Sequence, residues 1–151
     1  MTKLHEDWIA FLKLLNAHRV RFLVVGAHAV AAAGRPRFTA DLDIWIAPST
    51  ANARRVVAAV AAFGFPGLTV ERLEHPDVVV FLGREPFRID LLTSIDGVAF
   101  EPAWRHRTRA MLGGVRVGFL ARKELIANKR AAGRPKDLAD LALLGARAKK
   151  R

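Results

Sequence analysis

Apolar positions along the chain recur at two spacings, one typical of helices and one typical of strands. Apolar residues three and four apart predict helices at 3–18, 27–33, 49–63, 121–131 and 136–147. Short apolar runs bounded by Gly or Pro predict strands at 22–25, 40–46, 78–82, 87–92, 110–112 and 115–119. Glycine-containing turns after the third and fifth of these runs predict two antiparallel hairpins. The mixture predicts one α/β domain over residues 1–151, with a mixed sheet of about five strands flanked by helices and closed by C-terminal helices.

Composition agrees with a single folded domain. Of the 151 residues, 52% are apolar and 26% are charged, which excludes an intrinsically disordered chain. The absence of cysteine excludes disulfides, a thiolate nucleophile and a cysteine-ligated zinc ion. No apolar run approaches the roughly 18 residues of a membrane span, and charged side chains interrupt residues 1–20, unlike a signal peptide. We therefore expect a cytoplasmic protein without a membrane partner.

The formal net charge of +11 is concentrated in the C-terminal third. Residues 1–101 contain 11 basic and 11 acidic side chains, whereas residues 102–151 contain 14 Lys or Arg and 3 Asp or Glu. Such an excess favours a polyanionic partner, and nucleic acid is the usual candidate. The alternative is a solvated basic surface without a specific partner, because only Trp104 and Phe119 interleave aromatic rings with these charges.

Two aspartates stand in the strand predicted at 40–46. Residues two apart on a strand point to the same face, so Asp41 and Asp43 would lie side by side while the apolar residues of this strand enter the core. Two ionised carboxylates about 5 Å apart repel by roughly 3 kcal/mol. A divalent cation removes that repulsion, and Mg²⁺ is usually held by one or two carboxylates together with substrate phosphates. An Asp-x-Asp pair also occurs in turns and by chance, so the pair alone leaves a structural role open.

A third carboxylate stands in an equally apolar strand, 87–92. Asp90 alternates with Ile89 and Leu91 and therefore points away from the core. If this strand lay beside 40–46, three carboxylates would converge, enough for the metal pair used in phosphoryl transfer. The alternative is a salt bridge between Asp90 and Arg88 or a basic helix.

A glycine joins the first predicted strand to the short helix after it. Such a junction points backbone N–H groups at an anion, and Gly26 would let a phosphate approach the backbone closely. A plain strand–helix turn is the alternative. His28 follows in the Ala-rich helix, where packing or capping is the commoner role of a lone histidine.

Taken together, residues 25–45 resemble the signature of the polymerase-β-like nucleotidyltransferase superfamily. That signature places Gly and a small residue after a strand, Asp-x-Asp on the next strand and a third Asp on a later one. In this chain the matching residues are Gly26-Ala27, Asp41-Leu42-Asp43 and Asp90. The resemblance spans about residues 20–145 and points to the small AbiEii-like and MNT-like group found in bacterial toxin–antitoxin pairs. It implies a nucleotidyltransferase-like fold.

The resemblance also implies roles for the three carboxylates. Asp41, Asp43 and Asp90 would be catalytic and would bind two Mg²⁺ (or Mn²⁺) ions. Asp90 would in addition act as the general base that deprotonates the attacking hydroxyl.

Five further residues match nucleotide-binding positions of that family. Gly26 and Ala27 would hold the β- and γ-phosphates, Arg37 and Thr39 match the pattern leading into the aspartate pair, and Lys129 matches a helix lysine that meets the triphosphate. Ala27 replaces the usual Ser or second Gly, so a hydroxyl contact to phosphate is lost while the backbone N–H remains.

The implied activity is transfer of a nucleoside monophosphate from ATP or another NTP to a hydroxyl of RNA, such as a tRNA 3′ end, or of protein, with release of pyrophosphate. The resemblance also implies a cognate toxin or antitoxin protein as partner. The competing hypothesis is a non-catalytic nucleotide- or nucleic-acid-binding module, or a toxin–antitoxin partner protein that acts by contact. The sequence leaves open the nucleotide, the acceptor, the number of nucleotides added and the oligomeric state.

Overall fold

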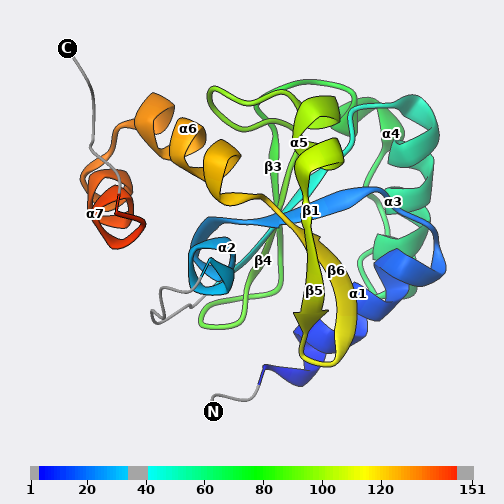
Figure 1. The fold of residues 1–151 in the computed structure, drawn as a ribbon. Coiled ribbons are helices and arrows are strands. Elements are labelled where there is room, and N and C mark those ends of the chain that lie inside the picture. The colour runs from blue at the N-terminus through cyan, green and yellow to red at the C-terminus, as the bar shows by residue number, and fades with distance from the viewer. Residues whose placement is uncertain (1–3, 34–40, 146–151) are drawn as a thin grey trace.

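The computed structural model describes residues 4–33 and 41–145, which form one mixed β-sheet with helices packed around it (Figure 1). The strands are β1 (Phe22–Val25), β2 (Leu42–Ile46), β3 (Val79–Leu82), β4 (Ile89–Leu92), β5 (Thr108–Leu112) and β6 (Val115–Phe119). The helices are α1 (Glu6–Ala17), α2 (Gly26–Ala32), α3 (Thr50–Ala62), α4 (Val70–Leu73), α5 (Phe100–His106), α6 (Arg122–Ala132) and α7 (Pro135–Leu143). The α/β class with a mixed sheet is confirmed. The described sheet has six strands rather than about five, because all six apolar runs join it.

The strand order is β3-β4-β2-β1-β6-β5. β3–β4 and β5–β6 are the two antiparallel hairpins that the turn residues predict. β1 and β2 are also antiparallel, whereas β2–β4 and β1–β6 are parallel pairs. A parallel pair needs a crossover connection, and α3 and α4 provide it between β2 and the β3–β4 hairpin. This crossover brings β4 directly beside β2.

The helices form two groups around the sheet. α1 packs against α3 and β6 through a buried stripe, consisting of Trp8, Phe11, Leu12 and Leu15. α7 pairs with α6, which also contacts α2, and in Figure 1 α6 and α7 lie on the opposite side of the sheet from α3 and α4. Within the described residues, no helix is long and apolar enough to cross a membrane. Helices α6 and α7 border the site described below.

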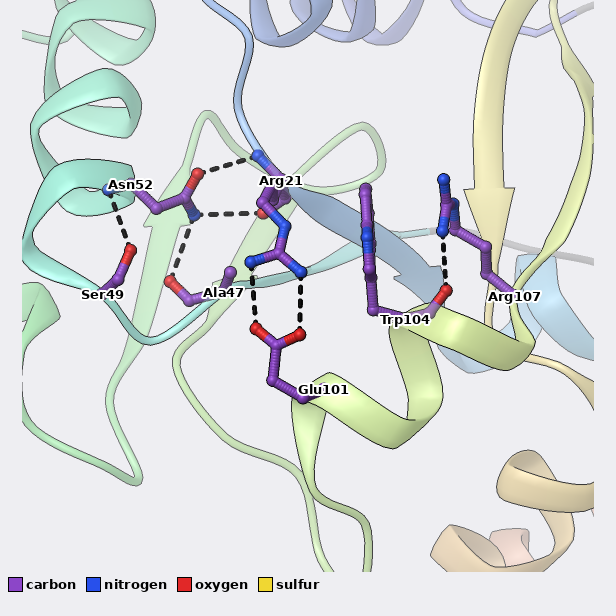
Figure 2. A network of polar contacts seen from close by, with 7 residues as sticks. All are labelled: Arg21, Ala47, Ser49, Asn52, Glu101, Trp104 and Arg107. Carbon is purple, nitrogen blue, oxygen red and sulfur yellow. Dashed lines mark hydrogen bonds and ion pairs between the residues drawn. The ribbon is translucent and has the colours of Figure 1, made fainter.

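A buried asparagine ties α3 to the sheet (Figure 2). Asn52 is 1% exposed, and its side-chain Oδ1 accepts a hydrogen bond from the Arg21 backbone N–H at 2.8 Å. Its Nδ2 donates to the carbonyl oxygens of Arg21 and Ala47 at 3.0 and 3.1 Å. The Arg21 guanidinium in turn forms a bidentate pair with Glu101 on α5, and lies over the ring of Trp104 at 4.8 Å. Three backbone groups near the sheet are thus satisfied by one side chain.

Replacing Asn52 with Leu is expected to lower the free energy of unfolding by about 3 kcal/mol. The variant leaves the Arg21 backbone N–H without its partner, and a buried unsatisfied polar group costs about 1–3 kcal/mol. The carbonyls of Arg21 and Ala47 each lose one of two donors and keep a backbone N–H, from Ala47 and Ser49 respectively. Chemical denaturation measures the change. Arg55→Leu, on the exposed side of the same helix, is the control and should change stability by less than about 0.5 kcal/mol. Equal stability of the two variants would refute the role assigned to Asn52.

Candidate active site

The parallel pairing of β2 with β4 places two aspartates next to each other. Asp43 is the register partner of Asp90, and Val25 at the end of β1 is the register partner of Asp43 on its other side. Asp41 comes immediately before β2, two residues from Asp43. All three carboxylates line one cleft, so the expected convergence of the two strands is confirmed.

Gly26 lies directly against the carboxylate of Asp43. It begins α2 with a φ of +67°, a conformation that side-chain-bearing residues rarely adopt. A Cβ built at this position would overlap Oδ2 of Asp43. Glycine at position 26 is therefore required twice, by the backbone conformation and by the neighbouring carboxylate.

Replacing Gly26 with Ala is expected to displace Asp43 and to remove activity in addition to lowering stability. Gly114→Ala is the matched control, because Gly114 also has a positive φ, of +80°, but no atom within 4 Å of an added Cβ. Both variants should lose about 1 kcal/mol from the left-handed backbone, while only Gly26→Ala should lose the nucleotidyl transfer that the sequence resemblance implies. Thermal melting and a transfer assay on both proteins measure this. Full activity in Gly26→Ala would contradict the placement of Asp43.

The cleft has a volume of about 760 Å³, within the range of small-molecule sites. One wall is the sheet, and the other comes from the loop after β4 and from α6 and α7. Asn128 on α6 donates a hydrogen bond to the carbonyl oxygen of Asp96 at 2.9 Å, and Gly97 packs closely against α6. These contacts hold α6 across the cleft from the carboxylates.

Arg88 is the principal cation among the carboxylates. Its Nε and Nη2 donate to Asp90 at 2.7 and 3.1 Å, and Nη2 lies 3.5 Å from Oδ2 of Asp41. Its Nη1 pairs with Glu85 at 3.2 Å. The salt bridge between Asp90 and Arg88, the alternative raised by the sequence, is therefore present. Arg88 also reaches Asp41, because β4 pairs with β2 and so lies beside it.

The cleft destabilises the charged form of Asp43. Burial raises the pKa of Asp43 to about 6, and the negative charges of Asp90 and Asp41 act in the same direction. The charge of Lys136 on α7 opposes this rise more strongly than that of Lys129. An additional positive charge beside Asp43 would therefore be bound favourably at neutral pH.

Lys129 also lines the cleft, but its ammonium is engaged within the α6–α7 pair. Nζ lies 2.9 Å from Oδ2 of Asp140 and 3.3 Å from Oδ1 of Asp137, and all three residues are buried. Arg134 contributes three further hydrogen bonds to Asp137, from its backbone and guanidinium. The side chains of Arg134 and Lys136, which the sequence analysis did not single out, line the same cleft from the start of α7. No local pattern could have identified them, because the turn between α6 and α7 brings them to the carboxylates.

The remaining sequence candidates divide into three cases. Gly26 and Ala27 line the cleft. Arg37 and Thr39 lie outside the described residues. His28 is buried, its ring makes an edge contact with Trp8 at 5.2 Å, and burial lowers its pKa to about 4. This environment matches packing, the commoner role expected for His28.

The donor chemistry of the cleft suits a hard divalent cation. Asp41, Asp43 and Asp90 offer only carboxylate oxygens, which Mg²⁺ prefers, and Oδ1 of Asp41 is buried without a hydrogen-bond partner among the described residues. Within the same residues, however, no three acidic or histidine side chains are arranged so that they could hold a metal ion as they stand. The Arg88 guanidinium supplies the compensating positive charge in this arrangement.

Comparison with known proteins adds one finding. Residues 4–151 match a family model described as a nucleotidyl transferase of unknown function (DUF2204). No curated protein matches the sequence. The match covers the sheet, the cleft and both closing helices.

Proposed function

The chain belongs to this family of nucleotidyl transferases of unknown function, and on that premise we propose that its cleft transfers a nucleoside monophosphate from an NTP to a hydroxyl of RNA or protein. The observation that carries the proposal is the pairing of Asp43 with Asp90 on parallel strands, with Gly26 against Asp43. A structural role alone gives no reason to place two carboxylates side by side in a partly buried cleft, since they destabilise each other.

The proposed reaction is an in-line displacement at the α-phosphorus. The acceptor oxygen forms a bond to the α-phosphorus while the bond to the bridging oxygen breaks and pyrophosphate leaves. Asp90 accepts the proton of the acceptor hydroxyl. Positioning of the two reactants in one cleft and stabilisation of the phosphate charge supply most of the rate enhancement in this class of reaction.

The triphosphate and its metal ions have matching groups in the cleft. The backbone at Gly26 and Ala27 would bind the phosphates, and Arg134 and Lys136 would offset the charge of the leaving pyrophosphate. Asp41, Asp43 and Asp90 would hold Mg²⁺ or Mn²⁺, and Arg88 would give up its contacts with two of them. When bound, such ions neutralise phosphate charge and lower the barrier to displacement.

Position-specific labelling tests the proposal. The protein is incubated with Mg²⁺, total cellular RNA and protein, and an NTP labelled at either the α- or the γ-phosphate. We expect label to reach a macromolecule only from the α-position, with each of the four NTPs tried in turn. Transfer from the γ-position would indicate a kinase instead. Nucleotide binding without any transfer would favour the non-catalytic binding module.

A further inference from the structure

An apolar shelf borders the cleft on the side of the sheet edge. It consists of Val79 and Phe81 on β3 and Leu92 on β4, all of which line the cleft. Val79 is 38% exposed and Phe81 is 58% exposed. Both belong to β3, which is an edge strand of the described sheet. Large apolar side chains at an open strand edge favour association with another molecule.

The register places the aromatic ring of this shelf beside the carboxylates. Phe81 is the register partner of Asp90, which is the partner of Asp43, which is the partner of Val25. One row across four strands therefore runs from an aromatic ring, through two carboxylates, to the glycine junction. Directly opposite residues of an antiparallel pair have Cβ atoms about 4.5–5.5 Å apart, so Phe81 adjoins Asp90.

The two ends of this row differ in chemistry. At the Asp43 end, Arg134 and Lys136 line the cleft. The charge of Lys136 opposes the rise in the pKa of Asp43 that burial causes, and the charge of Asp43 contributes to the raised pKa of Arg134. At the Asp90 end, the guanidinium of Arg88 lies over one face of the Phe81 ring, 4.2 Å from its centre, and Phe81 is still 58% exposed. Phosphates would be attracted to the Asp43 end. This leaves an aromatic surface at the other end, where the attacking hydroxyl would meet its general base, Asp90.

We propose that the apolar shelf stacks the terminal base of a single-stranded nucleic-acid acceptor, with Phe81 as the stacking ring. The inference rests on the proposed function and specifies its acceptor. A nucleobase presents a flat π-face, and stacking on an aromatic side chain contributes about 1–3 kcal/mol per base, or roughly 5- to 150-fold in affinity. Of the basic residues in the C-terminal third, Arg134 and Lys136 line the same cleft, and their charges suit the phosphates of the bound strand.

Binding of a fluorescent single-stranded RNA oligonucleotide, measured by anisotropy without NTP, tests the shelf directly. Phe81→Ala should weaken binding by about tenfold, and Phe81→Trp should restore it, because a larger ring keeps the π-face. Phe87→Ala is the matched control. Phe87 is 47% exposed but stacks on His5, and it is not among the described residues that line the cleft, so its loss should leave RNA affinity unchanged. Thermal melting confirms that each variant is folded.

Steady-state kinetics separates the shelf from the proposed function. Phe81→Ala should raise KM for RNA about tenfold and leave KM for the NTP within about twofold. Equal RNA affinity in wild type and Phe81→Ala would overturn the shelf, and so would labelling of protein alone with a rate independent of Phe81. Binding of RNA that depends on Phe81, without any transfer from the α-phosphate, would keep the shelf and overturn the proposed function.

Discussion

Asp43→Asn is expected to reduce nucleotidyl transfer by about 10³-fold while making the protein more stable at neutral pH. The loss of activity follows because Asp43 is the central carboxylate of the row, between Asp90 and Gly26. The gain in stability follows because its charge is buried against two other carboxylates. A change that harms only the fold would lower both quantities, so the opposite signs distinguish a functional carboxylate from a structural one.

The pH dependence of stability follows from the raised pKa of Asp43. Burial and the neighbouring charges raise it from 3.8 in the unfolded chain to about 6 in the folded protein. The folded state therefore binds the proton more tightly, and stability is lost as pH rises from about 4 through 6. At pH 7.5 without metal, Asp43→Asn should be more stable than wild type by at most about 3 kcal/mol, since each pKa unit corresponds to about 1.4 kcal/mol.

Chemical denaturation at pH 4 and pH 7.5, together with a transfer assay, measures both effects of Asp43→Asn. Asp7→Asn, an exposed carboxylate on α1, is the control and should change neither. A variant at position 43 that keeps more than about a tenth of wild-type activity would exclude Asp43 from the catalytic groups.

Lys129→Met is expected to lower the free energy of unfolding by about 3 kcal/mol, because it removes the ammonium that pairs with two buried carboxylates. Lys129, Asp137 and Asp140 are 6%, 0% and 3% exposed. Burial lowers the pKa of Lys129 despite the opposing charge and hydrogen bond of Asp137, which shows how strongly this position is desolvated. Methionine keeps an unbranched side chain, one atom shorter than that of lysine, and removes the ammonium with its charge and its hydrogen-bond donors.

The control for Lys129→Met is Lys123→Met on the exposed side of α6, which should change stability by less than about 0.5 kcal/mol. Adding Asp140→Asn to Lys129→Met should recover part of the loss. If both lysine variants unfold at the same denaturant concentration, the buried pair does not stabilise the α6–α7 hairpin. A stable Lys129→Met protein with weak NTP binding would instead assign Lys129 to the triphosphate, as the resemblance implies.

Local pattern predicts most of the sheet and the direction of its side chains. The alternation around Asp43 and Asp90 requires only a period of two, and it places each carboxylate on the side of its own strand opposite to the neighbouring apolar residues before any pairing is known. Their adjacency depends on the parallel pairing of β2 with β4, which neither strand encodes by itself. The reach of Arg88 to Asp41 depends on the same pairing.

The two helices that the pattern does not predict, α4 and α5, are short. α4 has four residues, too few for apolar periodicity. α5 contains Pro102 in its first turn, where proline is tolerated because the N–H there has no helical partner. Glu101 beside it pairs with Arg21, far away in sequence. Such tertiary contacts fix these elements, and the sequence carries only the first-turn Pro and Glu as a signal.

Counting bound Mn²⁺ by electron paramagnetic resonance, with a non-hydrolysable NTP analogue present, tests the central claim most directly. The account predicts that the wild-type protein with the analogue binds more Mn²⁺ than the analogue alone, and that Asp43→Asn and Asp90→Asn each lose this binding while remaining folded. Mn²⁺ binding that is the same in wild type and in both variants would contradict a metal-dependent transferase site at Asp41, Asp43 and Asp90.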